Sequence, residues 1–188
     1  MTLRSLLARG ILYLMGWQAK GRYPHELPKF IIVEMPHTSN WDFFIGLMFK
    51  WALGMRHIRV FIKKELFFPP LGWFLRAVGG YPIDRSGGKS YVENVVEAFR
   101  QEPYLVFTIT PEGTRRRVQR LKTGFYHIAR LAQVPLILAR LDYATRTLTF
   151  SDPFYVSGDI NKDMPEILRF FEGAMGKIPE NGFLHPKC

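Results

Sequence analysis

Residues 30–53 read FIIVEMPHTSNWDFFIGLMFKWAL, and this stretch indicates the fold class of the chain. Its beginning, residues 30–34, is a short apolar run that is typical of a buried strand. The three residues before Trp41 are all good helix N-cap types, and the apolar run over 41–53 predicts a helix that ends before Gly54. A strand that leads directly into a helix is the unit from which α/β domains are built.

The same alternation continues through the rest of the chain. Further strand-like runs lie at residues 58–63, 104–110, 134–141 and 145–150. Further helix-like segments lie at residues 71–78, 90–101, 124–133 and 164–175. Strands alternating with helices predict an α/β fold with a largely parallel central sheet flanked by helices. No linker or internal repeat interrupts the sequence, so we expect a single domain over residues 21–188.

Residues 1–20 form a separate segment in which eight large apolar side chains are interspersed with Arg4, Arg9 and Lys20. Its longest uncharged stretch is too short to cross a bilayer, which needs about 20 residues. We expect an amphipathic helix in the membrane interface, and the alternative is a helix that packs on the domain. Residues 66–75, LFFPPLGWFL, are a second candidate for lipid contact, with a buried loop and helix as the alternative.

The composition indicates a partner that carries negative charge. The chain has 26 basic and 16 acidic residues, a net charge of +10, and an aromatic share of 15%. Nucleic acid is not expected, because the sequence has no zinc-finger spacing, ribonucleoprotein-type aromatic motif or clear recognition helix. An anionic membrane surface suits the aromatic content better. The only cysteine, Cys188, can form no internal disulfide, which suits the cytosol. We therefore predict peripheral or monotopic attachment to the cytoplasmic face of a cell membrane.

His37 and Asp42 are the first candidate site residues. Five helical steps would leave their side chains about 140° apart, so the pair must straddle the helix start. From the first turn, the Asp42 carboxylate can orient the imidazole of His37 and stabilise its charged form, as a general base requires. The alternative is an acid that merely suits the helix dipole beside an unrelated loop histidine. Ser39 as an acylated nucleophile is less favoured than Ser39 as a helix cap, because no Gly-x-Ser-x-Gly elbow surrounds it.

Residues 110–115, TPEGTR, are a candidate anion site directly after a strand. Gly113 lets the backbone approach a ligand closely, Thr114 offers a hydroxyl, and Arg115 supplies charge. A charged surface loop is the alternative. In largely parallel sheets, sites gather where strands end, and this loop and His37 both follow strands.

Two further cations stand near strand ends. Lys63 opens the run KKEL, and Arg85 follows a glycine turn and a short extended piece. Arg85 can bind a phosphate through its forked guanidinium, or it can pair structurally with Asp84 or Glu112.

Taken together, these residues resemble the glycerolphosphate and lysophosphatidic acid acyltransferase superfamily. Four blocks stand in the order of that family between about residues 30 and 140: HTSNWD at 37–42, KKEL at 63–66 with PIDR at 82–85, PEGTR at 111–115, and VPLI at 134–137. Three positions depart from the family pattern. Pro36 replaces an asparagine that often precedes the histidine, Arg116 replaces a serine, and Ala139 replaces a late proline.

The resemblance implies a glycerolphosphate acyltransferase-like fold, with His37 as the base and Asp42 as its orienting partner. It implies a substrate site for the acceptor phosphate at Lys63, Arg85, Glu112, Gly113, Thr114 and Arg115. It also implies a fatty-acyl thioester on coenzyme A or acyl carrier protein as co-substrate, with no metal or separate cofactor. Lysophosphatidic acid is the default acceptor because of the clustered arginines, and another lysolipid or an amino-acid-based lipid is the alternative.

Two other classes of protein stay open at this point. One is a phosphoester hydrolase in which His37, Asp42 and Glu112 bind a metal ion, and a chelator would abolish its activity. The other is a catalytically silent lipid-binding protein that uses residues 1–20 and the basic surface. Its membrane binding would be unchanged by His37→Ala.

Overall fold

The computed structural model describes residues 2–77, 79–83 and 90–183. Within these residues a seven-stranded sheet has the order β1-β7-β6-β2-β5-β3-β4. The strands are β1 Gln18–Lys20, β2 Lys29–Met35, β3 Ile58–Lys63, β4 Gly80–Ile83, β5 Leu105–Ile109, β6 Leu136–Asp142 and β7 Thr147–Phe150. Every neighbouring pair is parallel except β6 and β7. The predicted α/β fold with a largely parallel sheet is confirmed.

The helices agree with the predicted pattern, with one displacement. They are α1 Leu3–Leu14, α2 Trp41–Ala52, α3 Leu71–Ala77, α4 Tyr91–Gln101, α5 Gly124–Ala132 and α6 Ile160–Phe171, with 3-10 turns at Lys64–Leu66 and Pro179–Asn181. Helix α6 begins four residues before the predicted start at 164. The reason is Asp159, which caps the helix by accepting a hydrogen bond from the Asn161 N–H at 3.0 Å.

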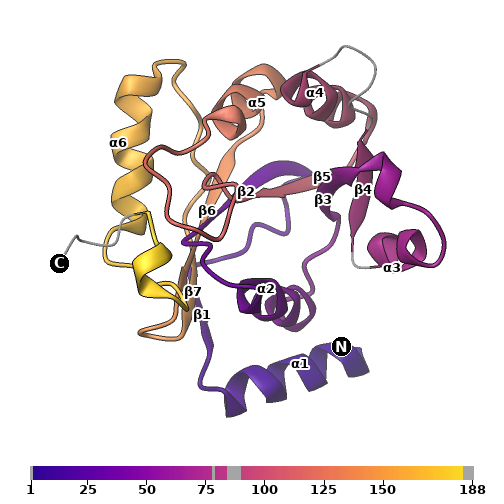
Figure 1. The fold of residues 1–188 in the computed structure, drawn as a ribbon, viewed down its shortest axis with the longest axis vertical. Helices are drawn as coiled ribbons and strands as arrows, with labels where there is room; N and C mark the ends of the chain where they lie inside the picture. The colour runs from indigo at the N-terminus through magenta and orange to yellow at the C-terminus, as the bar shows by residue number, and fades with distance from the viewer. Residues whose placement is uncertain (1, 78, 84–89, 184–188) are drawn as a thin grey trace.

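Helices lie on both sides of the sheet (Figure 1), and an apolar cluster covers each of its faces. Along β2, Ile31 and Val33 point to one face and Phe30 and Ile32 to the other, as the strand period of two requires. The first face packs against α4, α5 and α6, and the second packs against α2. This three-layer arrangement leaves the ends of the strands free to carry loops.

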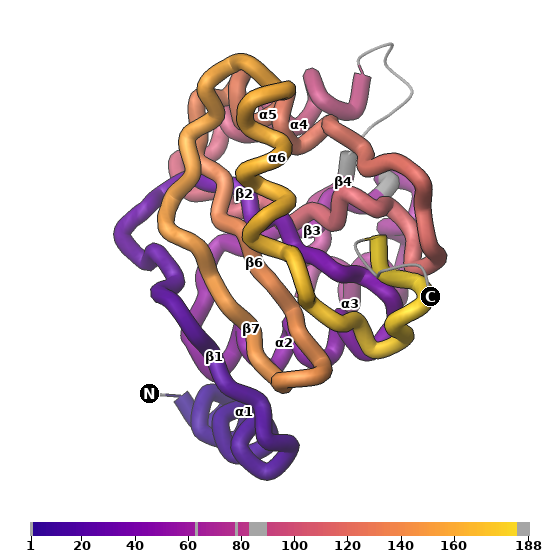
Figure 2. Tube along the Cα trace, turned by 90° about the vertical axis from the view of Figure 1, so that its left-hand side faces the viewer, coloured from indigo at the N-terminus to yellow at the C-terminus, as the bar shows by residue number. Residues whose placement is uncertain are grey.

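Helix α1 is attached to the domain through α2. Its Ala8 and Leu12 are buried, and Ser5 Oγ and Arg9 Nε both donate hydrogen bonds to the Ala52 carbonyl, at 3.4 and 2.9 Å. The cationic Arg9 suits this position because a helix carries partial negative charge at its carboxyl end. Figure 2 shows α1 at one end of the molecule, beyond β1 and β7. In the ranges given above, no helix has both the length and the apolar character to cross a bilayer.

Strand β1 joins the N-terminal segment to the sheet, because residues 18–20 pair with β7. The division of the chain at residue 20 stays a prediction, and so does the location of α1 in a membrane interface. Gly21 follows β1 with a φ of +71°, and a Cβ at this position would overlap the Phe150 carbonyl oxygen of β7. A side chain at position 21 therefore cannot be accepted without moving one of the two strands.

Replacement of Gly21 should lower the free energy of unfolding, whereas replacement of a glycine in α1 should not. We expect Gly21→Ala to lower the free energy of unfolding by about 2–4 kcal/mol, because it adds left-handed backbone strain to the overlap with Phe150. Gly10→Ala should raise it by up to about 1 kcal/mol, because Gly10 is helical and nothing lies within 4 Å of the added Cβ. Urea denaturation of both variants measures this, and a neutral effect of Gly21→Ala would contradict it.

The parallel strands bring several loops to one edge of the sheet. The carboxyl ends of β2, β3, β5 and β6 share this edge, since these four strands run in the same direction. Strand β2 leads there into the loop that carries His37, β5 leads into residues 110–115, and β6 leads into the turn before β7. Residues far apart in the sequence therefore meet at this edge.

Candidate active site

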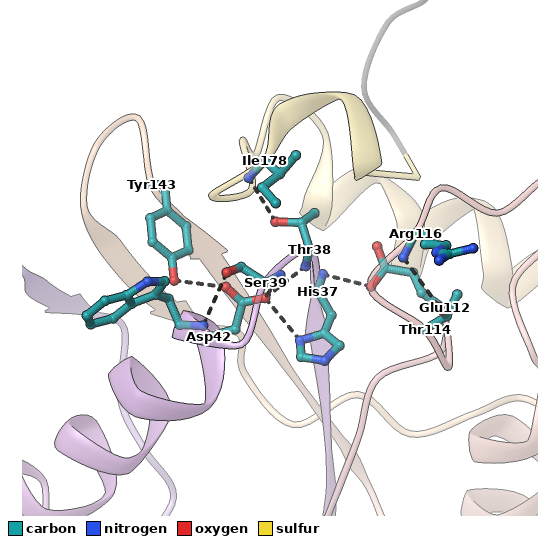
Figure 3. A network of polar contacts seen from close by, with 10 residues as sticks. His37, Thr38, Ser39, Asp42, Glu112, Thr114, Arg116, Tyr143 and Ile178 are labelled. Carbon is teal, nitrogen blue, oxygen red and sulfur yellow. Dashed lines mark hydrogen bonds and ion pairs between the residues drawn. The ribbon is translucent and has the colours of Figure 1, made fainter.

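Asp42 is the centre of the polar network at this edge (Figure 3). It lies in the first turn of α2, and only 1% of its surface is exposed. Its Oδ2 accepts hydrogen bonds from the backbone N–H groups of Thr38 and Ser39, at 2.8 and 2.9 Å. Its Oδ1 accepts a hydrogen bond from the Tyr143 hydroxyl, at 2.8 Å. Both carboxylate oxygens are therefore satisfied in spite of the burial.

The predicted proximity of His37 and Asp42 is present in the structure. His37 Nδ1 lies 3.0 Å from Asp42 Oδ2, but its N–H does not point along that line, so the contact is an ion pair rather than a straight hydrogen bond. Burial lowers the pKa of His37, but Asp42 and Glu34 raise it by more, so it lies above its usual value. Burial raises the pKa of Asp42, but its donors lower it by more. The geometry thus favours an imidazolium beside a carboxylate.

Glu112 connects the two sequence motifs. Its side chain is buried, with 2% exposed, and its Oε2 accepts a hydrogen bond from the backbone N–H of His37 at 2.8 Å. Burial raises the pKa of Glu112 to about 7, against the opposing effect of the His37 N–H. In the structure Glu112 therefore holds the loop that carries the imidazole. Its part in a phosphate site stays a prediction.

The last three residues of the 110–115 loop are exposed, whereas Pro111 is buried like Glu112. Gly113 has a φ of +64°, and a Cβ there would lie 2.6 Å from Lys122 Nζ. The Thr114 hydroxyl accepts a long hydrogen bond from the Arg116 N–H, at 3.4 Å. Arg115 is exposed and borders the same groove as His37. Lys122, which the sequence analysis missed, adds a further cation against Gly113.

Two predicted substrate residues cannot be placed in full. Lys63 is the last residue of β3, so its backbone lies at the edge of the sheet where the carboxyl ends of β2, β5 and β6 also lie. Its side chain and the whole of Arg85 lie outside the described residues. Their roles in binding a phosphate stay predictions.

An apolar groove of about 330 Å³ opens beside His37, between α2 and the sheet. Its apolar walls come from α2 and from four strands, and they include Phe43, Leu47, Ile32, Val60, Ala139, Leu141, Leu148 and Phe150. Glu34 and Arg115 are among the polar residues that border it. Burial raises the pKa of Glu34 to about 7, while the nearby His37 acts in the opposite direction. The groove therefore offers an apolar space next to a titratable group.

Two anchors of the His37 loop escaped the sequence analysis. Tyr143 stands 101 positions from Asp42, and a tyrosine in a turn carries no signal of such a contact. Thr38 is buried, and its hydroxyl accepts a hydrogen bond from the Ile178 N–H at 3.1 Å (Figure 3). Ser39 is not the N-cap, which is Asn40, but its hydroxyl accepts a hydrogen bond from the Trp41 N–H at 3.2 Å.

The structure also bears on the metal-binding alternative. Among the residues that it describes, no group of three or more His, Cys, Asp or Glu side chains could hold a metal ion. The phosphoester hydrolase hypothesis thus gains no geometric support from His37, Asp42 and Glu112.

Removal of the Tyr143 hydroxyl should raise the pKa of His37, because the hydroxyl binds the Asp42 carboxylate that faces the imidazole. Without this donor the carboxylate is more basic, so we expect Tyr143→Phe to raise the pKa of His37 by about half a unit to one unit. Tyr126→Phe is the matched control, because the Tyr126 hydroxyl donates an equally short bond, 2.8 Å, to Asp163 instead. Nuclear magnetic resonance titration of the imidazole measures the shift. Equal titration of His37 in both variants would show that Tyr143 does not act on it.

Comparison with known proteins identifies the class to which this site belongs. A family model described as Acyltransferase matches residues 22–139, a range that includes His37, Asp42 and the Glu112 loop. The chain belongs to the Acyltransferase family, and the resemblance carried by the four sequence blocks is confirmed.

The chain is also similar to particular acyltransferases. The chain is 30% identical to a 1-acyl-sn-glycerol-3-phosphate acyltransferase from Limnanthes douglasii, over 74% of this chain and 52% of that protein. It is 24% identical to one from Streptococcus pneumoniae, over 82% of this chain and 57% of that protein. The chain thus spans little more than half the length of these curated relatives. A crystal structure of the 1-acyl-sn-glycerophosphate acyltransferase PlsC from Thermotoga maritima has the same fold, with a TM-score of 0.57 at 17% identity over 89% of this chain and 76% of that one.

Proposed function

We propose that the protein is a membrane-associated acyltransferase that transfers a fatty acyl group from a thioester to the hydroxyl of a lysophospholipid. The observation that carries this proposal is the pairing of a half-buried His37 with the buried Asp42 beside an apolar groove, in a chain of the Acyltransferase family. The donor is an acyl group on coenzyme A or acyl carrier protein. The acceptor is lysophosphatidic acid, the substrate class named for the relatives in Limnanthes and Streptococcus.

In the proposed mechanism His37 acts as a general base. Since Nδ1 faces Asp42, Nε2 is the nitrogen that takes the proton from the acceptor hydroxyl. The hydroxyl oxygen then forms a bond to the thioester carbonyl carbon, the carbon–sulfur bond breaks, and the proton passes to the leaving thiolate. Asp42 stabilises the imidazolium that exists between these two proton transfers. Because a base must be unprotonated, the activity should rise with pH through the raised pKa of His37.

The acyl chain and the acceptor phosphate take separate surfaces in this proposal. The groove between α2 and the sheet suits the acyl chain, because apolar side chains form most of its wall next to His37. Arg115 and Lys122 suit the phosphate, because Arg115 belongs to the 110–115 loop and borders the groove near His37, and Lys122 lies against Gly113 of the same loop. The base therefore lies where the two substrates would meet.

Attachment to a membrane is supported by an apolar surface. Helices α1, α2 and α3 lie on one side of the sheet (Figure 1). Large apolar side chains more than 40% exposed on these helices and beside α3 are Leu3, Leu6, Leu7, Ile11, Tyr13, Leu14, Trp41, Phe43, Phe44, Leu66, Phe68, Trp73 and Phe74. An exposed apolar surface of this extent marks a site of membrane or protein contact. We propose that this side faces the lipid, as residues 1–20 and 66–75 led us to expect.

Loss of the base should abolish most of the transfer. We expect His37→Ala and Asp42→Asn to lower kcat by about a hundred- to ten-thousand-fold, the usual contribution of a general base. The assay follows a labelled acyl group from acyl-coenzyme A or acyl carrier protein to lysophosphatidic acid, other lysolipids and glycerol 3-phosphate. His127→Ala is the control, because His127 is exposed on α5 away from the groove. Full activity of His37→Ala would disprove the role of the base.

A larger residue at position 46 should impair transfer from long-chain acyl donors more than transfer from short-chain acyl donors. Gly46 belongs to α2 and borders the groove, and nothing lies within 4 Å of a Cβ added there. Leucine favours a helix over glycine by close to 1 kcal/mol, so Gly46→Leu should fold. We expect its kcat/KM to fall about tenfold for long-chain donors and to change little for short ones. An equal loss for every chain length would show that the acyl chain lies elsewhere.

A further inference from the structure

A second cavity, which we call the Tyr143 cavity, is lined by the tyrosine whose hydroxyl binds Asp42. It measures about 480 Å³, and its lining residues are Met15, Trp17, Trp41, Ile45, Tyr143, Arg146 and Lys177. It shares no lining residue with the groove beside His37. The site of acyl transfer proposed above therefore does not account for it.

The Tyr143 cavity combines two cations with aromatic walls and has no acidic lining residue. Arg146 Nη1 donates a hydrogen bond to the Met15 carbonyl at 2.9 Å, which fixes the guanidinium at the rim. Lys177 Nζ lies 5.9 Å from the centre of the Tyr143 ring. The carboxylate of Asp42 is buried and is bound by the Tyr143 hydroxyl and by His37. Two cations at one cavity form a site for an anion such as a phosphate.

The walls of the cavity are suited to a ligand that also has an apolar part. Trp17 is buried and makes an edge contact with Tyr143, with the ring centres 5.0 Å apart. Trp41, the first residue of α2, is 54% exposed. Tryptophan side chains and basic residues are both enriched where a protein meets the headgroups of a bilayer. The ligand chemistry that fits is a phosphate carried on an apolar body.

The position of the cavity indicates where such a ligand comes from. Met15 is the C-cap of α1, the helix whose exposed leucines we assign to the lipid surface. With α1 in the interface, the cavity would lie at the depth of the headgroups, where basic residues attract anionic lipids. A free phosphate has no apolar part that could pack against the apolar surface around the two cations.

We propose that the Tyr143 cavity binds the phosphate of an anionic phospholipid in the membrane, as a site distinct from the one that takes the acceptor. This inference rests on the membrane association proposed above. Tyr143 lines the cavity with its ring and holds Asp42 with its hydroxyl, so an occupied cavity would support the residue that orients His37.

The test compares vesicle binding by two variants of equal charge, without an acyl donor. Arg146→Gln/Lys177→Gln removes the cations of the cavity. Arg4→Gln/Lys20→Gln is the matched control, because it removes two exposed cations from α1 and β1, outside the cavity. With vesicles of phosphatidylcholine and phosphatidylglycerol, we expect the cavity variant to bind at least about tenfold more weakly than the control variant, since charge-assisted hydrogen bonds are lost. With phosphatidylcholine alone, the two should bind equally.

Each other outcome overturns a defined part of the proposal. Equal losses in the two variants would mean that binding follows total charge, and the site would be wrong. If glycerol 3-phosphate bound in solution as tightly as the anionic vesicles, and only the cavity variant lost this binding, the ligand would be a soluble phosphate ester rather than a lipid. If the unmodified protein bound neither vesicle, the membrane association itself would fail. Acyl transfer plays no part in these measurements. A failure of the proposed acyltransferase activity would therefore be distinguished from a failure of the lipid site.

Discussion

A buried carboxylate is the constraint on which the site depends. Asp42 lies at the start of a helix with almost no contact with solvent, where an unpaired charge would be strongly destabilising. Its partners come from two parts of the chain: the loop after β2 and the turn after β6. These parts meet only because β6 pairs with β2. The order of the strands is therefore a condition for the ionised form of Asp42, and Asp42 in turn determines where the imidazole lies.

The loop between β2 and α2 is held from several directions. Glu112 binds its backbone from the β5 side, and Ile178 binds Thr38 from near the end of the described chain. Asp42 binds it from α2 and is itself held by the Tyr143 hydroxyl from the turn after β6. Each anchor is an ordinary hydrogen bond. Together they remove the freedom that a surface loop usually has, which is the preorganisation that a base needs.

The sequence predicted those parts of the structure that depend on local pattern. The strand at residues 58–63 and the start of α2 at Trp41 follow from apolar runs and helix-start residues, and both have the predicted bounds. The proximity of His37 and Asp42 was also predictable, because five residues of chain and one helix start restrict it. Strand β1 was not predicted, since Gln18–Lys20 has no apolar pattern and exists as a strand through its pairing with β7. The contact of Tyr143 depends on strand order, which no local pattern encodes.

The buried carboxyl groups also change how the charge of the protein is counted. The formal value of +10 treats all 16 acidic residues as ionised. Burial raises the pKa of Glu34 and of Glu112 to about 7, so these two carboxyls carry less negative charge near neutral pH than the formal count assumes, and the net charge lies above +10. Glu34 and Glu112 therefore gain or lose their protons in a pH range where most other carboxylates stay ionised. Mild acidification would thus strengthen the attraction of the whole molecule to an anionic surface, and mild alkalinity would weaken it.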